Sequence, residues 1–142
     1  MTIPVWVLLG FAAWTVISVL ASVGVYRWGG SFRARAALMD FPAEATPGSD
    51  WYARAMRAHA NCIEDLPIYA AVVVAIIATG VHSHTLAVLA LVLLVARVGQ
   101  TITHIALQPS NVAVAVRFGL YAAQLVCMIW MGVGVAVFAY AH

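Results

Sequence analysis

Residues 54–79, RAMRAHANCIEDLPIYAAVVVAIIAT, join a polar half to a long apolar half. An α-helix rises about 1.5 Å per residue, so a helix over residues 52–79 exceeds the roughly 30 Å hydrocarbon core of a bilayer. Pro67 removes a main-chain hydrogen bond from such a helix, a defect that neighbouring helices of a membrane bundle absorb. The stretch predicts a transmembrane helix whose polar half, within one leaflet, faces other helices.

Three further apolar stretches flank this helix, at about residues 3–26, 84–107 and 112–140. Of the 142 residues, 65% are hydrophobic and 8% are charged, whereas a globular domain has about 45–50% apolar and about 25% charged residues. This composition excludes a soluble monomer and a disordered chain. We therefore expect an all-α integral membrane protein in which residues 1–142 form a single domain, a four-transmembrane-helix up-down bundle.

Arginine placement predicts how the bundle lies in the membrane. The expected loop over residues 27–50 and the start of the next helix carry Arg27, Arg33, Arg35, Arg54 and Arg57, whereas the turn over residues 80–83 carries no arginine. The positive-inside rule places that loop in the cytoplasm and both termini outside. The first apolar stretch has no basic residue before it, unlike a cleavable signal peptide. The Lys-free, Arg- and Ala-rich composition favours a bacterial inner membrane, and a net charge of +2 does not indicate nucleic-acid binding.

Polar residues of three helices are predicted to gather in the cytoplasmic leaflet. At about 100° per residue, each set occupies one side of its helix. The sets are Arg54, Arg57, Asn61, Glu64 and Asp65; Arg97, Gln100, Thr101, His104 and Gln108; and Arg117, Tyr121 and Gln124. An arginine within a span costs at least about 2.5–3.5 kcal/mol on insertion scales, so Arg97 needs a partner such as Glu64 or Asp65.

These polar residues have simpler interpretations than a ligand site. Arg54 can be an interface anchor with its charge in water, and the other charged side chains can form a cluster that only holds the helices together. Metal binding is not expected, because His82 and His84 lie in the turn at the opposite end from His59 and His104, and no Cys/His spacing resembles a zinc site.

A motif in the quoted stretch, R-x-x-R-A-x-x-N-x-x-E-x-x-P from Arg54 to Pro67, resembles the second-helix signature of the MAPEG family, the membrane-associated proteins in eicosanoid and glutathione metabolism. Supporting segments are Ala96-Arg97 in the third predicted helix and RFGLY at residues 117–121 in the fourth. Relatives of this kind include microsomal glutathione transferase, leukotriene C synthase and microsomal prostaglandin E synthase.

The resemblance implies a homotrimer whose three sites lie between subunits, open to the cytosolic leaflet, and bind glutathione. It implies that glutathione is held by Arg57, His59, Asn61, Glu64, Arg97, Gln100 and His104, with Arg117 and Tyr121 as catalytic residues. Glu64 matches the position that suits the α-amino group, and His59 the position that reaches the site of the neighbouring subunit. Relatives often have His or Tyr at the position of Gln100, and many have Tyr at the position of His104. Both residues therefore depart from the family pattern.

Arg117 has a direct chemical rationale in that resemblance. The nucleophile is a thiolate, and a free thiol of pKa about 8.5 is mostly protonated at neutral pH. A permanently charged guanidinium beside the sulfur favours the thiolate. The resemblance therefore implies a glutathione-dependent transferase or peroxidase that acts on lipophilic electrophiles arriving from membrane lipid. The alternative is a non-catalytic lipid-binding or scaffold member of the same family.

Overall fold

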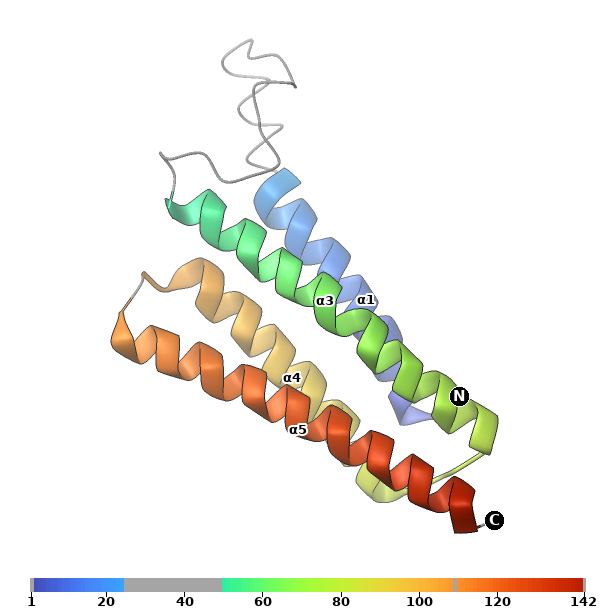
Figure 1. Cartoon of the computed structure of the whole chain (residues 1–142). Coiled ribbons are helices and arrows are strands. Elements are labelled where there is room, and N and C mark those ends of the chain that lie inside the picture. The colour runs from blue at the N-terminus through green and yellow to red at the C-terminus, as the bar shows by residue number, and fades with distance from the viewer. Residues whose placement is uncertain (1, 25–49, 109, 142) are drawn as a thin grey trace.

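The computed structural model describes residues 2–24, 50–108 and 110–141, which are almost entirely helical (Figure 1). The helices are α1 (Ile3–Val19), α3 (Asp50–Thr79), α4 (His84–Ala106) and α5 (Asn111–Ala141), and a π-helical turn, η1 (Leu20–Gly24), continues α1. The prediction of an all-α protein with four helices is confirmed for the described residues. The predicted cytoplasmic loop over residues 27–50 lies outside the described residues, except for Asp50, the first residue of α3.

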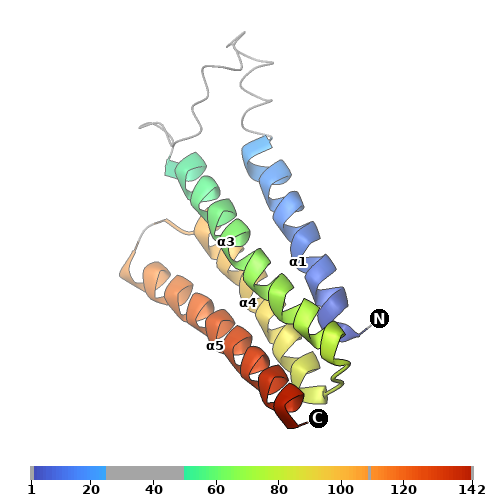
Figure 2. The same cartoon turned by 45° about the vertical axis from the view of Figure 1, so that its right-hand side comes forward.

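The four helices run alternately up and down (Figures 1 and 2). Helices α3 and α4 are central, because each of them contacts the other three. The N- and C-terminal ends of the described chain lie at one end of the bundle, and the opposite end holds the first turns of α3 and α5 and the last turn of α4. This second end, the α3/α5 entry end, is where the sequence places its polar residues.

Three of the described helices, α3, α4 and α5, are long and apolar enough to cross a membrane. The α-helical part of α1 has 17 residues, and the five residues of η1 continue it to Gly24, so the described part of the first expected span, at about residues 3–26, is helical and ends in a π-helical turn. The hydroxyl groups of Thr15 and Ser18 donate to the carbonyls of Phe11 and Thr15, at 2.9 and 3.0 Å. Such bonds compete with the main-chain ladder, and they precede the widening into η1.

The turn between α3 and α4 is confirmed at residues 80–83, and it is formed by residues close together in the sequence. Gly80 adopts a φ of 65°, a left-handed conformation that glycine reaches without steric cost and that commonly ends a helix. The Ser83 hydroxyl then accepts a hydrogen bond from the Thr85 amide at 3.2 Å, which caps the start of α4. The short turn makes α3 and α4 antiparallel neighbours.

The bundle core is apolar, and so is much of its outer surface. Phe11 and Tyr69 pack in the core with their ring centroids 6.3 Å apart, and the Tyr69 hydroxyl donates to the Pro4 carbonyl at 3.0 Å, which ties α3 to the start of α1. Large apolar side chains such as Val95 and Trp130 point outward and are more than half exposed. Outward apolar side chains on long apolar helices are typical of a protein whose solvent is lipid.

Candidate functional site

A cavity of about 330 Å³ opens near the α3/α5 entry end, between α3, α4 and α5. It is lined by Asn61 and Glu64 of α3, Gln100 and His104 of α4, and Val114, Arg117, Phe118 and Tyr121 of α5. Six of the nine predicted site residues therefore meet in one place. The cavity combines one carboxylate, one guanidinium and several neutral polar groups, a set suited to a ligand that carries charges of both signs.

Arg117 is held by main-chain carbonyls at the end of α4. Its Nη2 donates to the carbonyls of Thr103 at 3.0 Å and Leu107 at 2.7 Å. The last carbonyls of a helix have no partner within the helix, and a positive charge is favourable there. The Arg117 Nε is buried and has no hydrogen-bond partner. The guanidinium is thus anchored on one side and keeps an unused N–H donor.

Gln100 is held from the core side by Gln124. The Gln124 side chain is fully buried, and its Nε2 donates to Gln100 Oε1 and to the Leu120 carbonyl, each at 2.9 Å. Gln124 belongs to the polar set predicted on its helix but is not among the predicted site residues. This interhelical bond joins α4 to α5 behind the cavity.

Arg97 lies next to this layer but does not line the cavity. Its guanidinium forms an ion pair with Asp65, and the two residues are 1% and 3% exposed. The Arg97 Cζ also stands 5.2 Å from the ring centroid of Phe11, within the range of a cation–π contact. Of the two partners that the sequence allows, the structure selects Asp65. The guanidinium predicted to bind a ligand is thus paired with a carboxylate inside the bundle.

One hydroxyl and one thiol, those of Thr101 and Cys62, lie next to Arg97. The Thr101 hydroxyl donates to the Arg97 carbonyl at 3.0 Å, and the Cys62 Sγ lies 3.6 Å from that hydroxyl. All of these side chains are buried. Together they form a compact polar core that links α3 to α4 beneath the cavity.

Arg57 and His59 do not join the cavity within one chain. Arg57 is exposed, and His59 is partly buried with an Nδ1 that has no hydrogen-bond partner. Arg54, considered above as an interface anchor, is buried and its Nε has no partner. The arginine-rich start of α3 therefore carries donors that the described part of this chain leaves unused.

Val114 and Phe118 line the cavity but were not predicted from the sequence. They precede Tyr121 by seven and three positions, so they share its side of α5. Both are exposed apolar residues, and in a membrane helix such residues are indistinguishable in sequence from lipid contacts. Their spacing from Tyr121 is the signal that could have identified them.

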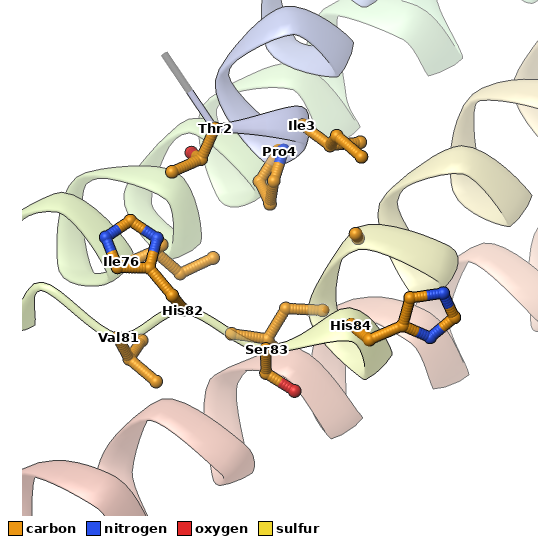
Figure 3. Close-up of a pocket in the computed structure, with 10 residues that line it drawn as sticks. Thr2, Ile3, Pro4, Ile76, Val81, His82, Ser83 and His84 are labelled. Atoms are coloured by element: carbon orange, nitrogen blue, oxygen red, sulfur yellow. The ribbon is translucent and has the colours of Figure 1, made fainter.

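A larger cavity, of about 590 Å³, lies at the other end of the bundle (Figure 3). The start of α1, with Thr2 and Pro4, faces the α3–α4 turn, with His82 and Ser83, across it. Within residues 2–24, 50–108 and 110–141, no three His, Cys, Asp or Glu side chains are placed to hold a metal ion. The described residues that line the larger cavity include no Asp, Glu, Lys or Arg, in contrast to the smaller cavity.

One of three comparisons with known proteins finds a match, and it covers nearly the whole chain. Searches of the curated proteins and of the solved structures match no protein to this chain. The model of the MAPEG family matches residues 7–137, which include most of α1 and α5, all of α3 and α4, and every residue of the smaller cavity. The chain is therefore a multi-pass membrane protein that belongs to the MAPEG family, the membrane-associated proteins in eicosanoid and glutathione metabolism.

Proposed function

We propose that the chain is a membrane-bound glutathione-dependent transferase or peroxidase that activates the glutathione thiol for attack on lipophilic electrophiles. The observation that carries the proposal is the cavity that brings the Arg117 side chain, held in place by two main-chain carbonyls, together with Glu64. Glutathione has an α-amino group, two carboxylates and a thiol. Glu64 supplies the charge that complements the amino group, and Asn61 and Gln100 supply neutral polar contacts.

In this proposal Arg117 is the group beside the sulfur, and Tyr121, one turn further along α5, contacts the same ligand. The thiolate is the reactive form of glutathione, and a fixed positive charge beside it lowers the free energy of that form. The two carbonyl bonds of Arg117 hold the guanidinium in place before the ligand arrives. Such preorganisation stabilises a developing negative charge without reorganisation at the moment of reaction.

The second substrate reaches the cavity from the membrane. Val114 and Phe118 form the apolar part of the cavity lining and are exposed on the outer surface of α5. A lipophilic electrophile dissolved in the bilayer contacts these side chains at the same depth as Tyr121. This arrangement supports a site open both to lipid and to the polar ligand.

We further propose a homotrimer in which Arg57 and His59 serve the site of the neighbouring subunit. Both residues sit on α3, outside the cavity of their own chain, and His59 keeps a buried Nδ1 without a partner. The orientation proposed is that of a bacterial inner-membrane protein with both termini outside and the site on the cytoplasmic side. The two ends of the described chain lie together at the end opposite the cavity, in support of this orientation.

A glutathione titration into detergent-purified protein tests the proposal. We expect binding, and we expect Glu64→Gln to weaken it by about tenfold, the effect of losing a hydrogen bond to a charged group. N-acetylglutathione, which lacks the charged amino group, is the matched ligand control. Its affinity is expected to be nearly the same for both proteins. Equal weakening for both ligands would contradict the pairing of Glu64 with the amino group, and absence of binding would reject the glutathione site.

One observation favours the alternative, a non-catalytic lipid-binding or scaffold protein. Arg97 forms an ion pair with Asp65, and one nitrogen of Arg117 donates to two carbonyls of α4. Both arginines therefore already have structural partners. In the alternative, replacement of either arginine unfolds or dissociates the protein and no glutathione affinity exists to be lost. The titration above separates the two functions directly.

A further inference from the structure

The pair formed by Gln100 and Gln124 is polar, buried and next to the proposed glutathione cavity. Gln124 is 0% exposed and Gln100 is 3% exposed, yet Gln100 contributes to the cavity lining. Neither residue has a charge that would require a partner. The role of the pair therefore depends on which atom of each amide donates and which accepts a hydrogen bond.

The orientation of the Gln124 amide is fixed by its own helix. Its Nε2 lies 2.9 Å from the Leu120 carbonyl, and a carbonyl oxygen only accepts hydrogen bonds. If the amide were turned over, two oxygens would face each other at this distance. The amide nitrogen of Gln124 must therefore point to Leu120, which is the usual basis for assigning a glutamine amide.

The orientation of Gln100 follows from that of Gln124. The same Nε2 lies 2.9 Å from the Gln100 side chain, so the atom of Gln100 that faces it must be an acceptor, Oε1. The Nε2 of Gln100 is then left for the cavity, and an amide nitrogen only donates. Gln124 thus determines, from the core, the hydrogen-bonding character of the cavity wall.

A packing role alone does not explain glutamine at position 124. The Gln124 Oε1 is buried and has no hydrogen-bond partner within the described residues. A buried acceptor without a partner is unfavourable, and an apolar side chain of similar volume avoids it. The amide therefore stabilises something that an apolar residue cannot, namely one orientation of its neighbour.

We infer that Gln124 is a positioning residue that fixes the Gln100 amide so that the cavity presents an N–H donor there, and that the site takes a hydrogen-bond acceptor of its ligand against Gln100. This inference rests on the proposed function, in which the ligand is glutathione. Its acceptor-only groups are the thiolate, the two carboxylates and the two amide carbonyls, of which the first three are charged. Gln100 of α4 and the guanidinium of Arg117 of α5 then supply donors from two different helices.

Gln100→Glu tests the direction of the donor. The carboxylate of this variant still accepts from Gln124 Nε2, so the bond between α4 and α5 is kept, but it offers an acceptor to the cavity. We expect glutathione affinity to fall by about tenfold or more, the loss of one bond to a charged acceptor. Gln100→Met, which offers neither donor nor acceptor, is expected to bind more tightly than Gln100→Glu and more weakly than the wild type.

Gln124→Met tests positioning, because it removes the amide at similar volume and leaves Gln100 free to rotate. We expect a loss of affinity of roughly threefold to tenfold, from one uncharged hydrogen bond. In the Gln100→Met background the same change should have no further effect, since residues that act through each other are not additive. The variants are compared by calorimetric titration of glutathione into protein that elutes in detergent as the wild type does.

The outcomes are distinct. Wild-type binding with unchanged affinity in Gln100→Glu overturns the inference and leaves the proposed function standing. An equal loss from Gln124→Met in both backgrounds shows that Gln124 acts other than through Gln100 and also overturns it. Absence of wild-type binding rejects the proposed function and the inference with it. If Gln124→Met does not fold, Gln100→Glu still tests the inference, because that variant keeps the hydrogen bond to Gln124.

Discussion

Asp65→Ala is expected to lower the free energy of unfolding by about 3–5 kcal/mol, the cost of leaving one partner of a buried ion pair alone. The pair with Arg97 is almost completely buried, and an arginine within a membrane span has few alternatives for its charge. Thermal unfolding in detergent, followed by circular dichroism, measures the loss. Glu64→Ala is the matched control, since Glu64 is the adjacent acidic residue of α3 and is exposed. Its effect is expected to stay below about 1 kcal/mol.

The double variant Asp65→Leu with Arg97→Met separates a structural role of Arg97 from a ligand-binding role. Replacing a whole buried pair by apolar side chains of similar volume is often neutral for stability, so we expect a folded protein. If Arg97 is taken by Asp65, glutathione affinity in this variant stays near that of the wild type. A folded double variant that no longer binds glutathione would restore Arg97 to the ligand site. Equal effects of Asp65→Ala and Glu64→Ala on unfolding would contradict the importance of the pair.

The fold is predictable from this sequence because apolar length and turn signals are strong in a membrane protein. The run of apolar residues sets the helices, and Gly80 with Ser83 marks the turn between α3 and α4. The end of α1 was less predictable. An apolar stretch does not reveal where side-chain hydroxyls such as those of Thr15 and Ser18 compete with the main-chain hydrogen bonds of the helix.

The candidate site was predictable as a layer but not in detail. Glu64 and Asp65 were assigned to one side of their helix, yet neighbouring residues differ by about 100° in direction. The structure separates them, since Glu64 lines the cavity and Asp65 lies in the core. Which of them pairs with Arg97 depends on how α3 and α4 pack, and helical periodicity within one helix contains no such information.

The positions of the remaining site residues also depend on contacts between helices that the sequence does not reveal. The family resemblance groups Arg57 with Asn61 and Glu64, but only the latter two line the cavity of a single chain. The positions of Arg57 and His59 relative to a ligand depend on a neighbouring subunit in the proposed trimer. The cap that Arg117 forms on α4 is also a tertiary contact, between residues 10 and 14 positions apart in the chain.

Arg117→Gln is expected to lower the rate of glutathione conjugation at neutral pH by roughly 20- to 30-fold in the proposed enzyme. The estimate assumes that the guanidinium lowers the thiol pKa by about two units from about 8.5, which changes the thiolate fraction at pH 7 from about 3% to about three quarters. The rate is measured with a chromogenic electrophile at saturating glutathione, together with the ultraviolet absorbance of the bound thiolate. Arg117→Lys, which keeps a charge and a donor for the α4 carbonyls, is expected to lose less.

The pH dependence distinguishes this role from the structural role of Arg117. Removing the guanidinium returns the thiol pKa towards about 8.5, so glutathione ionises by itself as the pH rises through that value. The rate deficit of Arg117→Gln should therefore shrink above about pH 8.5 if the guanidinium acts by ionising the thiol. Loss of the two carbonyl bonds at the end of α4 instead predicts a lower unfolding temperature and a deficit that does not shrink with pH. A rate deficit that stays constant with pH would show that Arg117 acts by stabilising the bundle. A rise in pH compensates only for the loss of thiol ionisation.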